Sequence, residues 1–351
     1  MKKILVAMSG GVDSAVAALL LKEMDLECVG VTMRLFDNAD VGVNQKSCCS
    51  LEDAHLAEQA ANSLNIPFYV LNMAAEFREQ VIERFVASYL RGETPNPCID
   101  CNRYVKFESL FARAMQLGMD FIATGHYASI EEKNGRYLLK RSVDRAKDQT
   151  YFLYTMTQEQ LSKTLFPLGS LCKSEVRGLA ELNGFSNAQK PDSQDVCFVR
   201  DKTYFDFIEE YSGQKMETGD FVDGGGNILG RHEGHIKYTI GQRKGLNIAF
   251  GKPMYVCEKN SDTNTVVLGD NDSLFCDELY ARDFNWIIEK PVRPIVATGK
   301  IRYGGREESL TAEVVGDRVR IVFDKPQRAI ARGQAVVVYS EDYVLGGGII
   351  C

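Results

Sequence analysis

Ser9-Gly10-Gly11-Val12-Asp13-Ser14 lies between an apolar run, residues 4–8, and an alanine- and leucine-rich run, residues 15–21. This order predicts a strand, a glycine turn and a helix. The start of a helix presents unpaired N–H groups and a partial positive charge, and glycines let an anion approach the backbone. The stretch therefore predicts a phosphate-binding loop, but not the Gly-x-x-x-x-Gly-Lys loop, because no lysine follows. The alternative is an ordinary turn in which Ser or Asp caps the helix.

The composition is that of a globular protein. With 351 residues, 45% of them hydrophobic and 25% charged, the chain can form two or three domains with a sizeable core. The net charge of −7 excludes a uniformly basic surface, so contacts with nucleic acid would come from local patches. Ten cysteines without a secretion signal favour reduced thiols in the cytoplasm. No apolar run reaches the ~20 residues of a membrane helix, which predicts a soluble protein.

Apolar and amphipathic runs alternate through the first 200 residues. Strands are expected at 28–33, 68–71 and 120–127, and helices at 54–64, 76–90, 157–164 and 173–183, with a further helix that ends at 117. This alternation predicts a parallel sheet, whose ligands lie at the carboxyl ends of its strands. Met33, Gly125 and His126 lie at such ends and are candidates for contact with a nucleotide.

The alternation stops beyond about residue 200. A glycine-rich stretch, 219–230, predicts hairpin turns rather than a second phosphate loop, because no strand and helix frame it. Basic and aromatic side chains are interleaved in residues 231–252, a combination that fits RNA better than a small anion. Short β-rich runs follow at 254–258, 265–268, 296–303, 310–315, 318–323 and 335–339. They predict an antiparallel, barrel-like C-terminal domain.

Two cysteines stand together in Pro97-Cys98-Ile99-Asp100-Cys101, near the expected start of a helix. A thiol at a helix start has a lowered pKa, so the pair could serve redox chemistry, a metal half-site or nucleophilic attack. A closed zinc site usually needs a second such pair, and the sequence has none. Cys197, in a polar turn, would by itself be interpreted as a buried structural thiol. The adjacent Cys48 and Cys49 make a poor chelating pair and receive no role.

Taken together, the motifs resemble those of the tRNA-specific 2-thiouridylases. These enzymes belong to the PP-loop N-type ATP pyrophosphatases and replace the 2-oxygen of the wobble uridine of tRNA (U34) by sulfur. The resemblance covers nearly the whole chain and rests on Ser9–Ser14, Thr94-Pro95-Asn96-Pro97 with Cys101-Asn102, Ala123-Thr124-Gly125-His126-Tyr127, Lys147-Asp148-Gln149, Asp192-Ser193-Gln194-Asp195-Val196-Cys197-Phe198 and Tyr238-Thr239-Ile240-Gly241-Gln242-Arg243. It implies an α/β, parallel-sheet PP-loop catalytic domain at 1–198, a small mixed or β, tRNA-binding domain at 199–275, and an antiparallel β-barrel-like domain at 276–351.

The resemblance also implies the site. ATP would lie against Ala7, Met8, Ser9, Gly10, Gly11, Val12, Asp13, Ser14, Met33 and Gly125. tRNA would contact Asn96, Pro97, Cys98, His126, Lys147, Asp148, Gln149, Arg302, Tyr303 and Gln334. Cys197 would carry a persulfide received from a sulfur-relay protein or a cysteine desulfurase, and Cys101 would be its partner thiol.

The implied reaction adenylates uracil O2, so that AMP becomes the leaving group, and Mg²⁺ neutralises the charge of the departing pyrophosphate. The terminal sulfur of the Cys197 persulfide, or hydrosulfide released from it, then adds to C2. Cys101 thiolate can attack the persulfide and leave a Cys101–Cys197 disulfide, which a reductant must reopen. The wobble base must leave its stack to enter such a pocket.

One position departs from the pattern of the family. Many members have Asp where this chain has Cys98, so an acid or base role does not carry over to it. A further hypothesis is that Cys98, Cys101 and Cys197 supply three thiolates to an iron–sulfur cluster with one open iron. Two rival functions are a PP-loop ligase that amidates a small molecule and a non-catalytic RNA-binding protein. Cys101 and Cys197 speak against the first, because such ligases have no evident use for them. The intact Ser9 and Asp13, together with both cysteines, speak against the second.

Overall fold

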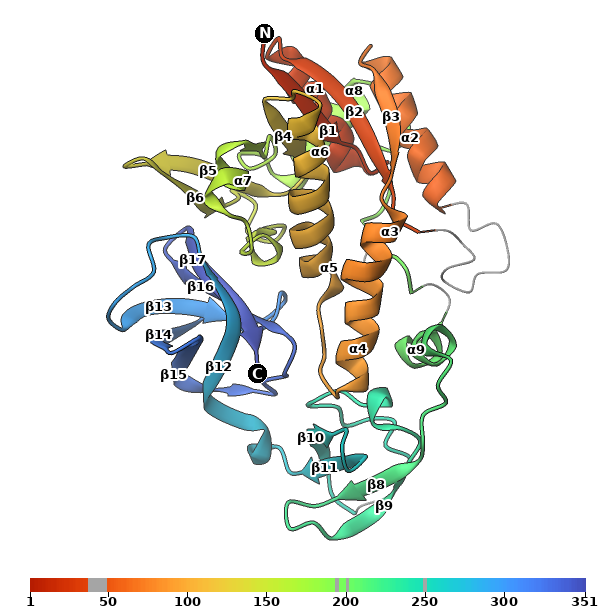
Figure 1. Ribbon diagram of the computed structural model, residues 1–351, viewed down its shortest axis with the longest axis vertical. Coiled ribbons are helices and arrows are strands. Elements are labelled where there is room, and N and C mark those ends of the chain that lie inside the picture. The colour runs from red at the N-terminus through yellow and green to blue at the C-terminus, as the bar shows by residue number, and fades with distance from the viewer. Residues whose placement is uncertain (37–48, 193–195, 200–201, 249–250) are drawn as a thin grey trace. The chain divides into compact units, whose positions relative to one another are not determined.

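The computed structural model describes residues 1–36, 49–192, 196–199, 202–248 and 251–351 (Figure 1). The prediction for Cys48 therefore lies outside the described residues. Contacts between residues divide the chain into two compact units. The first comprises Met1–Val81, Cys98–Phe198 and Ser340–Gly346, and the second comprises Ile82–Pro97, Val199–Tyr339 and Gly347–Cys351.

A five-stranded sheet organises the first unit, in the order β3-β2-β1-β4-β7. Its strands are β1 (Lys3–Ala7), β2 (Glu27–Arg34), β3 (Phe68–Asn72), β4 (Phe121–Thr124) and β7 (Thr164–Leu165). All neighbouring strands are parallel, which confirms the predicted sheet. The strand order reverses direction between β1 and β4, and such a reversal opens a crevice at the carboxyl ends of the strands.

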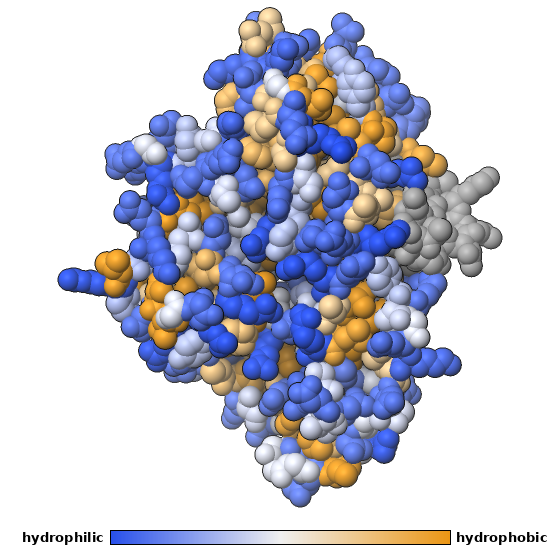
Figure 2. All heavy atoms as spheres, viewed as in Figure 1, coloured by the Kyte–Doolittle hydropathy of each residue, from blue (hydrophilic) through white to orange (hydrophobic). Residues whose placement is uncertain are grey.

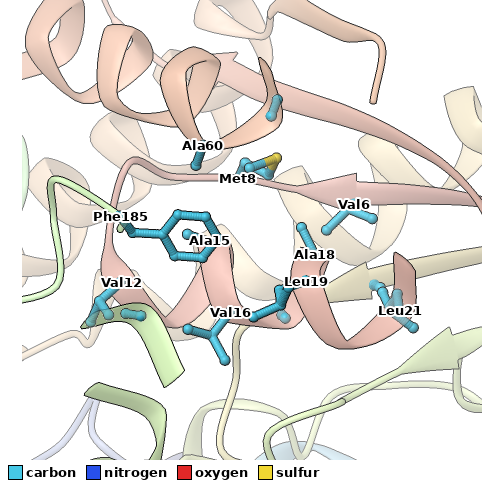
Figure 3. Close-up of a cluster of buried hydrophobic side chains, with 14 of the residues drawn as sticks. Val6, Met8, Val12, Ala15, Val16, Ala18, Leu19, Leu21, Ala60 and Phe185 are labelled. Atoms are coloured by element: carbon cyan, nitrogen blue, oxygen red, sulfur yellow. The ribbon is translucent and has the colours of Figure 1, made fainter. Parts of the chain in front are cut away.

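Three helices share one hydrophobic cluster with this sheet: α1 (Val12–Glu23), α2 (Cys49–Ser63) and α8 (Lys173–Leu182). Figure 3 shows Val6 and Met8, from β1 and the residue after it, close to α1 side chains such as Ala15 and Ala18. Eight residues of α1 are buried, because α8 and α2 pack against it as well as the sheet. A helix enclosed in this way is apolar on most sides, as the alanine- and leucine-rich sequence indicated.

The two long helices expected around residues 76–90 and up to 117 each contain a wider π-helical turn. The first consists of α3 (Ala74–Phe77), η2 (Arg78–Glu83) and α4 (Arg84–Leu90), and the second of α5 (Pro97–Asp100), η3 (Cys101–Leu110) and α6 (Phe111–Gln116). The apolar spacing predicted a helix at both places but did not distinguish a 3.6-residue turn from a wider one. π-Helical turns are rare and often occur at functional sites.

A hairpin and two short helical segments lie between β4 and β7 in the sequence of the first unit. A hairpin of β5 (Ala128–Lys133) and β6 (Arg136–Arg141) turns through Asn134 and Gly135, both with positive φ. η4 (Thr150–Phe152) and α7 (Gln158–Ser162) follow, and Thr157 and Gln160 form a capping box at the start of α7. The helices predicted at 157–164 and 173–183 are thus present, with slightly shorter bounds.

In the second unit, α9 (Tyr204–Ser212) is a helix that was not predicted from the sequence. The sequence does contain residues typical of a helix start and a helix end. Thr203 and Asp206 form a capping box, and Gly213 ends the helix with φ +67°. A four-stranded sheet follows in the order β10-β11-β8-β9. Its strands are β8 (Gly219–Val222), β9 (Ile228–His232), β10 (Tyr255–Asn260) and β11 (Thr265–Gly269), with short turns η5 (His235–Lys237) and η6 (Asp272–Leu274).

The C-terminal strands follow the order β12-β15-β14-β13-β16-β17, and an additional β12–β17 pairing closes them into a barrel. They are β12 (Phe275–Trp286), β13 (Ile295–Lys300), β14 (Glu308–Val315), β15 (Arg318–Arg328), β16 (Ala335–Ser340) and β17 (Tyr343–Ile350). The barrel-like prediction is confirmed, but β12 and β17 were not predicted. β12 carries several charges, and β17 contains three consecutive glycines that lower its strand propensity.

Polar residues cover most of the face shown in Figure 2, and apolar residues form small groups among them. No helix in the described ranges is both long and apolar enough to cross a membrane.

Candidate active site

The loop between β1 and α1 leaves the start of the helix open. Gly11 occupies the N-cap position, and no side chain caps the helix there, which argues against the turn capped by Ser or Asp. The hydroxyl of Ser14 instead accepts a hydrogen bond from the backbone N–H of Ser9 at 3.0 Å and donates to the carbonyl of Gly11 at 3.0 Å. The first-turn N–H groups of α1 are thereby left for an anion.

Two glycines bring other backbone segments against this loop. Gly10 has φ +76°, and a β-carbon on it would lie 2.2 Å from the carbonyl oxygen of Asp53. Gly125 follows β4, and a β-carbon on it would lie 2.7 Å from the carbonyl carbon of Asp13. The ends of β1 and β4 therefore meet where the strand order reverses. Met33, at the same edge on β2, is half-buried.

The carboxylate of Asp13 is the centre of a hydrogen-bonded cluster. The ammonium of Lys173, the first residue of α8, lies 2.7 Å from each of its oxygens. The hydroxyl of Tyr127 donates to the same carboxylate at 2.9 Å. Burial, and then the charge of Asp13, raise the pKa of Tyr127, so this phenol remains a donor. The sequence predicts a helix that begins at Lys173 but indicates no role for this lysine.

Asp192, five residues before Cys197 in the sequence, belongs to the same cluster. One of its oxygens lies 2.8 Å from the Lys173 ammonium, and the other lies 2.8 Å from the ammonium of Lys147. Partial burial opposes the charged form, but the two lysines outweigh it and hold the pKa of Asp192 at about 2. Asp192 is consequently ionised throughout the neutral range, and its ion pairs are intact there.

Cys101 is the first residue of η3, and its side chain is partly buried. Burial raises the pKa of the Cys101 thiol to about 11, and the positive charge of Lys106, one turn further along, acts in the opposite direction. The next residue, Asn102, is buried and donates to the carbonyl of Phe152 at 3.3 Å. Cys101 therefore rests as a thiol, contrary to the lowered pKa that its position suggested. Like Lys173, Lys106 was not singled out from the sequence, although its charge affects the pKa of Cys101.

Cys197 is exposed, in contrast to the buried thiol that its sequence alone suggested. The neighbouring Phe198 is buried and packs edge-on against Phe77 of α3, with ring centroids 5.7 Å apart. α3 in turn packs against η3, the helix that begins with Cys101. Both cysteines belong to the first unit, together with the loop after β1.

Several residues expected to contact tRNA make internal hydrogen bonds. His126 is buried and bonds to the Thr124 hydroxyl at 2.7 Å, and burial lowers its pKa well below the usual value. Asp148 accepts from the backbone of Ser142 at 3.1 Å. Gln149 accepts from the Tyr127 backbone at 2.9 Å. These hydrogen bonds hold the loop that carries Lys147. Contact between these residues and tRNA stays a prediction.

The other expected tRNA contacts lie in the second unit, apart from Cys98. Arg302 and Tyr303 are exposed beyond β13, as a surface for RNA requires. The Gln334 amide donates to the carbonyl of Thr94 at 2.8 Å, which ties the barrel to the Asn96–Pro97 stretch. Cys98 is exposed. Their contact with RNA also stays a prediction.

The described side chains of this site are not grouped in a way that is typical of a metal site. Within the described ranges, no three His, Cys, Asp or Glu side chains gather closely enough to hold a metal ion. Cys98, Cys101 and Cys197 therefore do not form the three-thiolate set that the iron–sulfur hypothesis requires.

This architecture defines a nucleotide-binding domain followed by two β domains, and known families match it in that order. Residues 2–201 match the tRNA methyl transferase HUP domain, residues 205–270 the tRNA methyl transferase PRC-barrel domain, and residues 276–350 the aminomethyltransferase beta-barrel domain. Curated relatives indicate which family of this class the chain is similar to. The tRNA-specific 2-thiouridylase MnmA of Clostridioides difficile (strain 630) is 51% identical over 353 residues, which are 99% of this chain and 98% of the relative.

Two further relatives carry the same name. That of Lachnoclostridium phytofermentans is 51% identical and covers 100% of this chain and 99% of its own length. That of Caldicellulosiruptor saccharolyticus is 51% identical, with 99% and 98% covered. The chain belongs to the tRNA-specific 2-thiouridylase family, whose PP-loop domain uses ATP.

Proposed function

We propose that this protein catalyses ATP-dependent 2-thiolation of the wobble uridine of tRNA. The observation that carries the proposal is the joint presence, in one unit, of an open helix start after β1 and of Cys101 and Cys197. Full-length likeness to curated 2-thiouridylases supports it and does not favour an amidating ligase or a non-catalytic RNA-binding protein. Residues 1–198 would perform the chemistry, and residues 199–275 and 276–351 would hold the tRNA.

The first step activates the oxygen that is to be replaced. Backbone N–H groups of the loop from Ser9 to Ser14 bind the phosphates of ATP, because a helix start carries a partial positive charge. The uracil O2 attacks the α-phosphate, pyrophosphate departs, and AMP becomes the leaving group on C2. Mg²⁺ usually binds through substrate phosphates with one or two carboxylates, and Asp13 is the carboxylate in this loop.

The second step transfers sulfur. Cys197, exposed and reachable by a donor, receives a persulfide from a sulfur-relay protein or a cysteine desulfurase. Its terminal sulfur adds to C2, and AMP leaves. The Cys101 thiolate attacks Sγ of Cys197 and breaks the S–S bond, so that sulfur stays on the base. A Cys101–Cys197 disulfide remains, and a reductant returns two electrons and two protons.

Cys101 must lose its proton for this step. At a pKa of about 11, only a small fraction is thiolate at neutral pH, so a bound substrate or a nearby cation has to stabilise the anion. Lys106 already acts in that direction. Cys98 would border the target base, and an iron–sulfur cluster has no support from the arrangement of the three cysteines.

The test is sulfur transfer into unmodified tRNA with ATP, cysteine, a cysteine desulfurase and this protein. Thiolated tRNA is retarded in a mercury-containing gel. We expect a retarded band with the native protein and none with Cys197→Ser or Cys101→Ser, while both variants still bind ATP. Cys276→Ser, which changes an exposed cysteine of the second unit, serves as the matched control and retains the band. Full thiolation by Cys197→Ser excludes the mechanism.

A further inference from the structure

A single lysine joins the nucleotide loop to the stretch that leads to Cys197. The Lys173 ammonium lies 2.7 Å from both oxygens of Asp13 and 2.8 Å from Oδ1 of Asp192. An ammonium has three N–H donors, and these three carboxylate oxygens match them in number. The Lys173 side chain is only 11% exposed, whereas the side chains of Asp13 and Asp192 are 30% and 36% exposed.

The position of Lys173 is itself fixed. It begins α8, and its backbone N–H donates to Asp144 at 3.0 Å. Its ammonium lies 5.7 Å from the centre of the Tyr127 ring, and Tyr127 also donates to Asp13. α8 packs against α1, the helix that carries Asp13 in its first turn. The lysine therefore joins two segments of a rigid framework.

Two further basic side chains lie close to the Asp192 carboxylate. Lys147 pairs with its second oxygen at 2.8 Å, and an Arg177 nitrogen lies 3.7 Å from its first. Five residues later Cys197 is exposed, and directly after it Phe198 is buried against Phe77. Along the sequence, Cys197 thus lies between Asp192, which is held by ion pairs, and Phe198, which is buried.

We propose that Lys173 is a positioning residue for sulfur transfer: by pairing with both Asp13 and Asp192, it holds Cys197 where the Cys101 thiol can reach it. This inference rests on the proposed function, in which sulfur must be delivered beside the nucleotide loop. In this role Lys173 would act through another side chain and not on a reacting atom. Its effect is exerted through Asp192, so losing that one ion pair impairs the cysteine exchange and leaves ATP consumption largely intact.

The first measurement requires neither tRNA nor ATP. The intact protein is treated with diamide, which takes two electrons and two protons from two thiols, and the Cys101–Cys197 disulfide is followed by peptide mass spectrometry. We expect Asp192→Asn to slow this disulfide about tenfold, because the neutral amide loses the ion pairs with Lys173, Lys147 and Arg177. Asp192→Glu, which keeps the charge, recovers most of the rate. Lys22→Gln, at the exposed far end of α1, retains the native rate.

The second measurement compares 2-thiouridine formed with pyrophosphate released. Asp192→Asn is expected to release pyrophosphate within about twofold of the native rate but to form about tenfold less 2-thiouridine per pyrophosphate. A purely structural defect would lower both products together and leave their ratio unchanged. Lys173→Gln also weakens pyrophosphate release, because it removes the partner of Asp13.

The outcomes separate the two proposals. Equal disulfide rates in native protein and Asp192→Asn overturn the role of Lys173, as does native protein that forms no Cys101–Cys197 disulfide. A third outcome is that the disulfide forms in native protein and forms slowly in Asp192→Asn, but native protein never thiolates tRNA. That outcome supports the positioning role and overturns the proposed function. Unchanged melting temperatures of the variants are required for both comparisons.

Discussion

The backbone of Gly125, at the end of β4, lies directly against the backbone of Asp13 and Ser14 at the start of α1. A β-carbon on Gly125 would be 2.7 Å from the carbonyl carbon of Asp13 and 2.7 Å from the nitrogen of Ser14. Both neighbours are main-chain atoms, so no change of side-chain rotamer relieves the contact. This close approach sets the shape of the loop between β1 and α1.

Gly125→Ala is therefore expected to displace the loop and weaken ATP binding by about tenfold, or roughly 1.4 kcal/mol. Calorimetric titration with a non-hydrolysable ATP analogue measures this. Gly178→Ala in α8 is the matched control, because nothing lies within 4 Å of its added carbon. That variant should bind ATP normally and be more stable by about 0.5–1 kcal/mol through helix propensity. Native affinity in Gly125→Ala contradicts the prediction.

The reactivity of Cys101 should depend steeply on pH. Because burial raises its pKa to about 11, the thiolate fraction grows about tenfold for each pH unit between 7 and 10. The rate of Cys101 alkylation by iodoacetamide, read by peptide mass spectrometry, should follow the same slope. Lys106→Met removes the opposing positive charge and should slow alkylation further at every pH. A rate that levels off near pH 8.5 would show an unperturbed thiol.

His126 should make the folded protein less stable in mild acid. Burial holds its folded pKa well below the unfolded value of about 6.5, so below that pH the unfolded chain binds a proton that the folded chain does not. Stability is therefore lost as pH falls from 7.5 to 5.5. His126→Gln should flatten this pH dependence by up to about 1.4 kcal/mol per pH unit. Urea titrations measure it, with the exposed His55→Gln as the control that keeps the native slope.

Arg302 offers a test of the tRNA surface on the barrel. If this exposed guanidinium contacts a phosphate, Arg302→Gln should weaken tRNA binding several-fold and reduce the slope of log K against log salt by about one. Filter binding from 50 to 300 mM salt would provide both values. Arg113→Gln, an exposed change on α6, should alter neither. An unchanged slope in Arg302→Gln removes this residue from the interface.

Local patterns were sufficient for much of the fold. Ser9–Ser14 between two apolar runs predicted the loop between β1 and α1, and the alternation that followed predicted the parallel sheet. The patterns failed where tertiary contacts override propensity. The charged β12 and glycine-rich β17 are strands because they pair with each other and close the barrel. A β-carbon on Gly348 would lie 2.8 Å from the carbonyl oxygen of Arg282, so that close pairing requires glycine.

By itself, the sequence of this protein determined the class of its chemistry, because a glycine loop at a helix start and cysteine thiols belong to short motifs whose residues act through their own chemical groups. Only the tertiary structure decided how these motifs are joined. Lys173 and Asp13 are 160 residues apart, and no spacing rule connects them. They meet because α8 packs on α1, and the same packing brings Asp192 to the nucleotide loop. The thiol of Cys101 is likewise protonated because the folded chain buries it.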